Sequence, residues 1–175
     1  LAKAYLGAEP YSEMTRKKIE DLYGIDVYNS YGMSEMNGPG VAFECVHKCG
    51  MHVWEDNYII EVIDPRTQEP VADGKEGELV FTNLTRRATP LIRYRSRDIA
   101  AIVKGACRCG RTHRRISRIT GRTDDMLIIN GVNVYPSQIE TVIMRIPEVG
   151  TNYQIHLEKE GTIDKMIVKV EIYSK

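Results

Sequence analysis

The sequence predicts a mixed α/β fold, because short runs of strand-forming residues alternate with two amphipathic helical patterns and with turn dipeptides. Of the 175 residues, 42% are hydrophobic and 27% are charged, and 24 Lys and Arg balance 24 Asp and Glu. This composition is typical of a globular chain and excludes the disordered, collagenous and disulfide-dense classes. The longest aliphatic run, residues 126–129, is far short of the roughly 18 apolar residues that a membrane span requires.

The first predicted element is a helix that begins after Ser12 and ends before Gly24. Ser is a favoured N-cap and Gly a favoured C-terminal stop, and Met14, Ile19 and Leu22 supply apolar positions between them. A short strand, Ile25–Asn29, follows. The chain starts at Leu1 without a Met or a leader, so we expect an internal fragment.

The middle of the chain is predicted to be mainly β. Strand-like runs occur at Tyr58–Ile63, Glu78–Thr82 and Ile99–Val103, and turn dipeptides such as Asp73-Gly74 lie between them.

The last 50 residues predict a compact hairpin–helix–strand–strand unit. Asn130-Gly131 stands between two β-prone arms and is the dipeptide best suited to a two-residue type I′ turn. Pro136 then opens a helix that we expect to end near Pro147, and two strands follow at Tyr153–Leu157 and Met166–Ile172. We expect a domain boundary near residues 123–125.

Positive charge is concentrated between Arg86 and Arg122, where eleven Arg and Lys104 face the single acid Asp98. Such a belt favours an anionic ligand, for example a nucleotide, a coenzyme or a nucleic acid, and a solvated Arg-rich surface is the alternative.

Two short motifs suit nucleotide chemistry. Tyr31-Gly32-Met33-Ser34-Glu35 follows a predicted strand and offers an aromatic ring, a hydroxyl and a carboxylate, which can stack on a base, bind phosphate and hold Mg²⁺. Asp98, inside the basic belt, is suited to accept hydrogen bonds from the two hydroxyls of a ribose. A surface acid at Glu35 and an ordinary Asp–Arg pair at Asp98 are the alternatives.

A third motif makes the pattern specific: Gly121-Arg122-Thr123-Asp124-Asp125 leads directly into the Asn130-Gly131 hairpin and Tyr135-Pro136. Together with Gly7-Ala8-Glu9-Pro10 and the two motifs above, the chain resembles the adenylate-forming superfamily of acyl-CoA synthetases, most closely its aryl branch of phenylacetate–CoA ligases. The resemblance covers nearly the whole chain. It implies that residues 1–123 are the end of a large nucleotide- and acid-binding domain, with a β-rich region at 41–120. Residues 124–175 would be part of a small, mobile α+β domain.

The resemblance also implies an activity. The family activates a carboxylate with MgATP to an acyl-adenylate and then forms a thioester with coenzyme A, so an aryl carboxylate, ATP, Mg²⁺ and coenzyme A are the expected ligands, in a cytoplasmic enzyme. The resemblance also implies a role for each matching residue. Ala8, Glu9 and Pro10 would line the adenine with Tyr31 against its face, Ser34 would bind the α-phosphate, and Glu35 would help to hold Mg²⁺. Asp98 would accept hydrogen bonds from the ribose hydroxyls, and Arg122 would lie near the ribose and the phosphate. Asp124 would be the hinge of the small domain, and Gly131 would border the path of coenzyme A. Pro39 would be a wall of the aryl pocket, unless it is an ordinary turn proline.

This chain departs from the family pattern. The upstream phosphate loop and the C-terminal catalytic Lys are not in it, so we expect the fragment alone to be inactive. Asn130 also stands where this branch is expected to carry a basic residue.

The cysteines form a separate constellation. Cys45, Cys49 and His52 lie close together, and Cys107 and Cys109 follow 55 and 57 residues after His52. Two such clusters separated by a β segment are the usual layout of a structural Zn²⁺ site. Cys45, His52, Cys107 and Cys109 are the first choice of ligands, Cys49 and His113 are alternates, and disulfides or free thiols are the competing interpretations.

Two other functions compete with the ligase. A zinc-stabilised nucleic-acid-binding module would use the same cysteines and the basic belt, but between Arg86 and Arg122 the only aromatic residue is Tyr94. A noncatalytic nucleotide-binding remnant is the third hypothesis. We expect neither a nucleic-acid nor a membrane partner, and a homodimer is possible.

Overall fold

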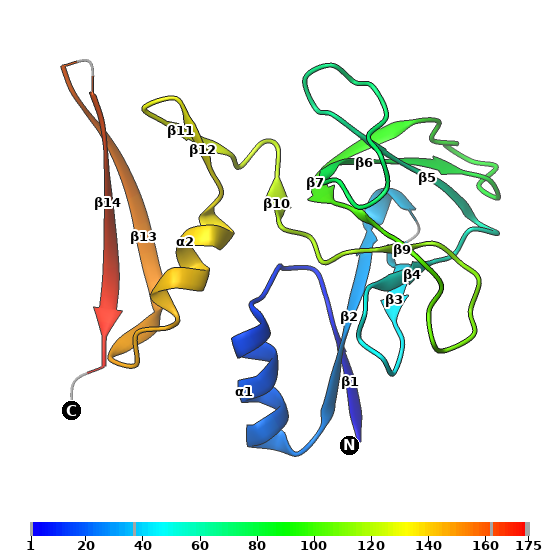
Figure 1. Ribbon diagram of the computed structural model, residues 1–175, viewed down its shortest axis with the longest axis horizontal. Coiled ribbons are helices and arrows are strands. Elements are labelled where there is room, and N and C mark those ends of the chain that lie inside the picture. The colour runs from blue at the N-terminus through cyan, green and yellow to red at the C-terminus, as the bar shows by residue number, and fades with distance from the viewer. Residues whose placement is uncertain (1, 37, 162, 174–175) are drawn as a thin grey trace.

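A parallel β-α-β unit opens the chain in the computed structural model, which describes residues 2–36, 38–161 and 163–173. Strands β1 (Lys3–Leu6) and β2 (Asp26–Met33) are parallel neighbours, and helix α1 (Glu13–Tyr23) connects them (Figure 1). The predicted caps of α1 are confirmed. The Ser12 side chain accepts a hydrogen bond from the backbone of Thr15, and Gly24 ends the helix in the left-handed conformation.

The buried side chain of α1 is a charged one. Arg16 is 2% exposed and forms a two-pronged ion pair with Glu44, at 2.8 and 3.1 Å, whereas the apolar Met14 and Leu22 are exposed. The ion pair, rather than an apolar stripe, therefore anchors α1 to the sheet.

The first sheet has six strands in the order β1-β2-β3-β4-β9-β8. The short helix η1 (Ser34–Met36) connects β2 to β3. The remaining members are β3 (Gly38–Glu44), β4 (Met51–Val53), β9 (Arg115–Ile116) and β8 (Ile102–Val103).

The second sheet has four strands in the order β10-β7-β6-β5. They are β10 (Gly121–Arg122), β7 (Tyr94–Ala100), β6 (Gly77–Asn83) and β5 (Tyr58–Ile63). The bounds predicted for β5 are confirmed, whereas the single strand predicted over Ile99–Val103 is wrong. The chain leaves this sheet after Ala100 and enters the first sheet as β8, and Ala101 is held between them by its backbone hydrogen bond to the Ser117 hydroxyl.

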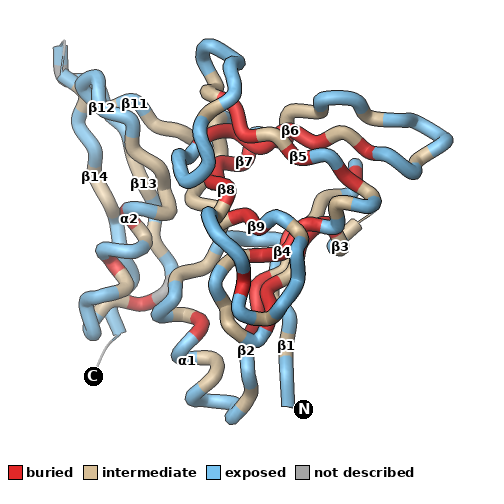
Figure 2. The backbone as a smooth tube through the Cα atoms, turned by 45° about the vertical axis from the view of Figure 1, so that its right-hand side comes forward, coloured by how far each residue is buried: buried red, intermediate tan, exposed pale blue. Residues whose placement is uncertain are grey.

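The main hydrophobic core lies between these two sheets, where the buried parts of the chain gather (Figure 2). Both sheets contribute to it: Val41 and Val53 come from the first, and Leu79 and Phe81 from the second, each with no exposed surface.

The last part of the chain forms the predicted unit. The hairpin β11 (Leu127–Ile129) and β12 (Val132–Val134) precedes α2 (Pro136–Ile143), and the long antiparallel pair β13 (Val149–Glu160) and β14 (Ile163–Ile172) follows. The turn residues Asn130 and Gly131 both have positive φ, 48° and 81°, as a type I′ turn requires. Helix α2 ends earlier than expected, at Ile143, because beyond it the backbone N–H groups of Arg145 and Ile146 bond to the carbonyls three residues back instead of four. Within the described residues, no helix is long and apolar enough to cross a membrane.

Candidate functional site

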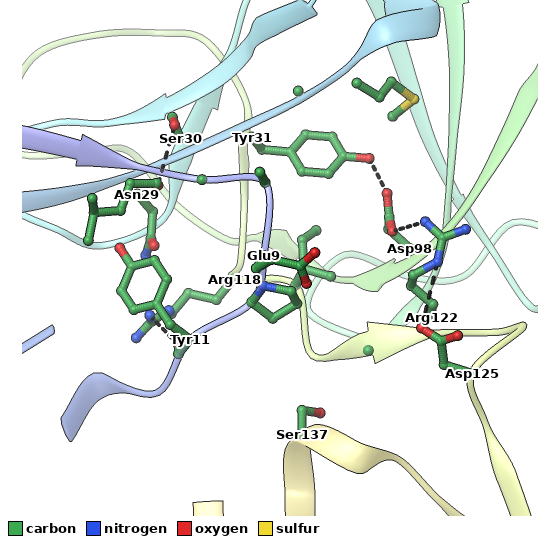
Figure 3. Close-up of a pocket in the computed structure, with 18 of the residues that line it drawn as sticks. Glu9, Tyr11, Asn29, Ser30, Tyr31, Asp98, Arg118, Arg122, Asp125 and Ser137 are labelled. Carbon is green, nitrogen blue, oxygen red and sulfur yellow. Dashed lines mark hydrogen bonds and ion pairs between the residues drawn. The ribbon is translucent and has the colours of Figure 1, made fainter. Parts of the chain in front are cut away.

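A cavity of about 610 Å³ lies where β1 and β2 end and faces α2 (Figure 3). Loops at the carboxyl ends of neighbouring parallel strands are the usual place for a ligand in an open α/β sheet. Its lining comes from residues 6–11 at the end of β1, residues 29–33 of β2, Met51 of β4, Asp98 of β7, part of residues 118–125 around β10, and α2 with Tyr153 of β13. The motifs at Ala8–Pro10, Tyr31, Asp98 and Arg122 are therefore brought together around one cavity.

Asp98 is the best-defined acid of the cavity. It lies on β7, is 9% exposed, and its carboxylate is held from two sides. The Tyr31 hydroxyl donates to one oxygen at 2.5 Å, and Arg122 Nη1 donates to the other at 3.0 Å. Burial raises the pKa of Asp98 above its usual value, and hydrogen bonds from Tyr31 and the charge of Arg122 oppose that rise.

Strand pairing places Arg122 in this position. Strand β10 runs antiparallel to β7, and Arg122 lies directly opposite Asp98. The same guanidinium forms a two-pronged pair with Asp124, with both distances 2.9 Å, and this contact lowers the pKa of the Asp124 carboxyl. Arg122 thus connects the cavity to the segment that leads into the C-terminal hairpin.

The opposite wall contains residues that sequence reasoning missed. The Arg118 guanidinium lies over the Tyr11 ring at 4.8 Å and donates to the Tyr11 carbonyl at 2.7 Å. Ala8, which was predicted from the sequence, adopts a left-handed φ of 72°, which is uncommon for a residue with a side chain and occurs often at binding sites. Arg118 belongs to the basic belt, and that concentration of Arg residues was the feature of the sequence that could have indicated this wall.

Helix α2 closes the cavity from the C-terminal side. Ser137 Oγ donates to the carbonyl of Thr120 at 2.5 Å, and Glu140 and Tyr153 also line the cavity. A Cβ added at Gly121 would lie 2.6 Å from Cδ1 of the Tyr135 ring, so the start of α2 packs directly on β10. No local pattern predicts these contacts, because they depend on how the C-terminal unit sits on the sheets.

Several predicted site residues lie outside this lining. Ser34 and Glu35 are in η1, directly after Met33, which does line the cavity. Pro39 is exposed within β3, and Gly131 lies in the turn between β11 and β12.

A second cluster of functional groups lies at the edge of the first sheet. One donor atom from each of Cys45, His52, Cys107 and Cys109 lies within 4.8 Å of the other three. The Sγ atoms of Cys45 and Cys107 are 3.6 Å apart, and Sγ of Cys109 is 3.4 Å from Nε2 of His52. Cys45 directly follows β3, His52 lies on β4, and the loop between β8 and β9 brings Cys107 and Cys109. These are the four residues chosen first from the sequence.

The two alternates differ in position. Cys49 lies beside this cluster, with its Sγ 3.6 Å from that of Cys107. His113 packs its ring edgewise on Trp54 at 5.8 Å.

Five of the eleven Arg residues of the basic belt form ion pairs with acids of the same chain. Ion pairs join Arg93 to Glu61, Arg95 to Glu78, Arg114 to Asp73, Arg118 to Glu13 and Arg122 to Asp98. These side chains hold the fold together instead of forming one free cationic surface.

The chain is similar to known proteins in sequence and in fold. A model of the AMP-binding enzyme family matches residues 1–84, and a model of the AMP-binding enzyme C-terminal domain matches residues 131–175. The phenylacetate-coenzyme A ligase of Thermus thermophilus is 53% identical over 173 residues, which are 98% of this chain and 39% of that protein. The chain therefore spans about two fifths of the length of this relative.

One solved enzyme resembles the chain in two of its states. 2-Hydroxyisobutyryl-CoA ligase in the postadenylation state, in complex with R3-HIB-AMP, matches with a TM-score of 0.87 at 32% identity, over 97% of this chain and 37% of that one. The same enzyme in the thioesterification state, with 2-HIB-AMP and CoA, matches with a TM-score of 0.65 at 31% identity, over 98% of this chain and 37% of that one. The arrangement of the parts of this chain is thus closer to that of the postadenylation structure.

Proposed function

Because this chain belongs to the adenylate-forming family of AMP-binding enzymes, we propose that it is part of an ATP-dependent aryl-acid CoA ligase. In the first half-reaction the substrate carboxylate attacks the α-phosphorus of ATP, which forms an acyl-adenylate and releases pyrophosphate. In the second, the thiol of coenzyme A attacks the acyl carbon, which forms the thioester and releases AMP. The observation that carries the proposal is the Asp98 carboxylate, fixed by Tyr31 and Arg122 at the wall of the cavity.

Asp98 is proposed to accept hydrogen bonds from both ribose hydroxyls. A carboxylate is a strong acceptor, and it is most selective when its orientation is fixed before the ligand arrives. Residues 8–10 would then line the adenine, as their place in the cavity wall supports. The ring of Tyr31 is proposed to contact the adenine, and its hydroxyl to orient Asp98 toward the ribose.

The phosphates are assigned to the part of the cavity beside Arg122 and the end of β2. Arg122 supplies a cation near the ribose and α-phosphate, where negative charge develops during transfer. Ser34 would bind the α-phosphate, and Glu35 would hold Mg²⁺ together with phosphate oxygens. The exposed carboxylate of Glu35 fits such an ion, because Mg²⁺ keeps several waters and takes few protein ligands. The bound Mg²⁺ would neutralise the charge of the phosphates.

We propose that residues 1–123 and 124–175 are two units that rotate about Asp124 between the half-reactions. What supports this is the difference between the two states of 2-hydroxyisobutyryl-CoA ligase, which the same structure of this chain matches with TM-scores of 0.87 and 0.65. In the second orientation the Gly131 hairpin would border the path of coenzyme A.

The substrate class rests on the relatives, which are named for phenylacetate. An aryl carboxylate of that kind is the proposed acid, and Pro39 is kept as a proposed part of its pocket. ATP and coenzyme A as substrates, together with four cysteines that form no disulfide, favour the cytoplasm.

The cysteine and histidine cluster is proposed to hold a structural Zn²⁺ within residues 41–120. Zn²⁺ bonds of about 2.0–2.3 Å in a tetrahedron separate the donor atoms by about 3.3–3.8 Å. The distances of 3.4 and 3.6 Å between donor atoms fit that geometry. Four protein ligands leave no open position, so the ion would join the strands β3 and β4 to the loop before β9 without catalysing.

The decisive experiment measures aryl-acid-dependent exchange of pyrophosphate into ATP by the full-length protein, for the parent and for Asp98→Ala. We expect the KM for ATP to rise about tenfold or more, because both ribose hydroxyls lose a charged acceptor, and the KM for the acid to change less. Asp73→Ala, which removes an exposed carboxylate on another surface, is the matched control. Nucleotide binding without any exchange would instead support the noncatalytic remnant, and an unchanged KM for ATP in Asp98→Ala would remove Asp98 from the site.

A further inference from the structure

Cys49 is a fifth residue of metal-ligand type beside the four-residue cluster. Its Sγ lies 3.6 Å from Sγ of Cys107, but it is not among the four donors that lie within 4.8 Å of one another. A tetrahedral ion accepts only four ligands, so this thiol stays outside the proposed coordination shell.

Cys49 differs from its neighbours in exposure. It is exposed, whereas Cys45 and Cys107 are buried and each has 6% of its surface exposed. A small oxidant arriving from solvent therefore reaches Cys49 before it reaches either of these ligands.

Arg115 fixes the position of Cys49. Its guanidinium donates to the Cys49 carbonyl at 2.5 Å and to the Cys49 sulfur at 3.0 Å, and it also donates to the carbonyl of Gly105 at 2.9 Å. Arg115 itself is only 5% exposed. One buried side chain thus joins the loop that carries Cys49 to the loop that carries Cys107, and it keeps the two sulfurs near each other.

We propose that Cys49 is a peroxide-reactive site that forms a reversible disulfide with Cys107. The Cys49 sulfur attacks one oxygen of hydrogen peroxide, the O–O bond breaks, and the leaving hydroxide takes a proton to become water, which leaves a sulfenic acid. The Cys107 sulfur then attacks the sulfenic sulfur, the S–O bond breaks, and the hydroxide leaves as a second water. The two sulfurs lose two electrons in total, which reduce one peroxide to two waters.

The geometry allows this bond with little rearrangement. A disulfide is about 2.05 Å long, so two sulfurs 3.6 Å apart must approach by only about 1.5 Å. Cys107 cannot remain a metal ligand once its sulfur is in a disulfide, because thiolate is the ligating form. This consequence rests on the proposed zinc site. The ion would lose one of its four ligands and leave, and a thiol reductant would restore the site.

The test treats the full-length protein with hydrogen peroxide and compares it with Cys49→Ser. Peptide mapping under non-reducing conditions identifies the disulfide, and a colorimetric chelator follows zinc release. We expect a peptide pair that joins Cys49 to Cys107, together with release of zinc that slows about tenfold or more in Cys49→Ser. Dithiothreitol should reverse the link. Cys49→Ser replaces an exposed side chain, so we expect the untreated variant to keep its zinc. Zinc in the untreated variant is the control that shows that it folds.

The outcomes separate the two proposals. A disulfide confined to Cys45 and Cys107, whose sulfurs are also 3.6 Å apart, or equal rates of release in parent and variant, would overturn the role of Cys49. Protein that contains no zinc before treatment would overturn the metal site, and the peptide map alone would then decide whether Cys49 and Cys107 form the disulfide.

Discussion

The hydroxyl of Tyr31 donates to the carboxylate of Asp98 at 2.5 Å, although 67 residues separate the two in the chain. Tyr31 is itself immobilised, because its ring is buried and stacks on Phe81 with the centroids 5.9 Å apart. A hydrogen bond from a fixed donor orients the carboxylate before any ligand binds. Tyr31 is therefore a positioning residue for the proposed ribose acceptor.

The first prediction tests this hydrogen bond. Tyr31→Phe removes the hydroxyl and keeps the ring, so we expect ATP binding to weaken about tenfold, within the range for a hydrogen bond to a charged group. Isothermal titration calorimetry of the full-length protein measures the Kd. Tyr5→Phe makes the same change at a half-exposed ring of the neighbouring strand β1 and should leave the Kd unchanged. Equal affinities in Tyr31→Phe and the parent would show that the hydroxyl does not position the acceptor.

The second prediction concerns stability against pH. Burial raises the pKa of Asp98 in the folded state, so protons bind the folded state more tightly than the unfolded one. The stability that Asp98 contributes is complete below its unfolded pKa, about 3.9, and is lost as the pH rises through its higher folded pKa. We therefore expect Asp98→Asn to raise Tm relative to the parent at pH 7, and we expect this advantage to vanish near pH 3.5. A melting series over pH measures it, and an advantage that grows toward acid pH would contradict the sign.

Local patterns predicted the elements whose sequences carry strong signals of their own. The Asn130-Gly131 turn, the caps of α1 and the start of α2 at Pro136 depend on backbone preferences of a few residues. The four residues that converge in the cysteine and histidine cluster, which we propose as metal ligands, were also chosen from their spacing, because two separated pairs of such residues are a compact signal.

The remainder depends on tertiary contacts. Strand β3 contains Gly38-Pro39-Gly40, which locally argues against a strand, and pairing with both β2 and β4 overrides that preference. Strands β4, β9 and β10 have two or three residues each, too few for any periodic pattern. The wall formed by α2 was not predicted either, since it depends on the orientation of one unit on another.

The third prediction concerns metal removal. Cys109→Ser should reduce zinc from about one ion per chain to well below that and lower the Tm, because metal binding is coupled to folding. Elemental analysis and a melting curve measure both effects in the full-length protein. Cys49→Ser is the matched control, since it removes a neighbouring thiol outside the four-donor group. Equal loss of zinc in both variants would contradict the choice of ligands.

The fourth prediction concerns the hairpin that we place beside the path of coenzyme A. Its tip residue Asn130 forms three hydrogen bonds with Asp164 of β14. The Asn130 backbone N–H donates to Asp164 Oδ2 at 3.0 Å. The Asn130 side-chain amide donates to the Asp164 carbonyl and accepts from the Asp164 backbone N–H, both at 2.8 Å. Asp164→Ala should slow thioester formation from a preformed acyl-adenylate about fivefold, equivalent to ~1 kcal/mol, and leave pyrophosphate exchange unchanged. Asp164→Asn keeps an oxygen acceptor and should restore most of the rate. If both half-reactions fell together, the contact would be merely structural.

The last prediction tests the orientation of the C-terminal unit. Gly121 does not have a left-handed backbone, so Ala is compatible with its conformation, but the added Cβ would lie 2.6 Å from the Tyr135 ring. Gly121→Ala should therefore displace α2 from the cavity and disfavour the arrangement that resembles the postadenylation structure. We expect pyrophosphate exchange to fall about tenfold or more, because overpacking typically costs about 1–3 kcal/mol. Thioester formation from a preformed acyl-adenylate should fall less.

The double variant Gly121→Ala with Tyr135→Ala separates a steric clash from damage to β10. Removing the ring removes the atom that the new Cβ would meet, so the double variant should exchange pyrophosphate faster than Gly121→Ala alone. A simple loss of strand β10 would not be rescued by a change in α2. Additive losses in the double variant, together with equal losses in both half-reactions, would therefore refute the assignment of this contact to the adenylating orientation.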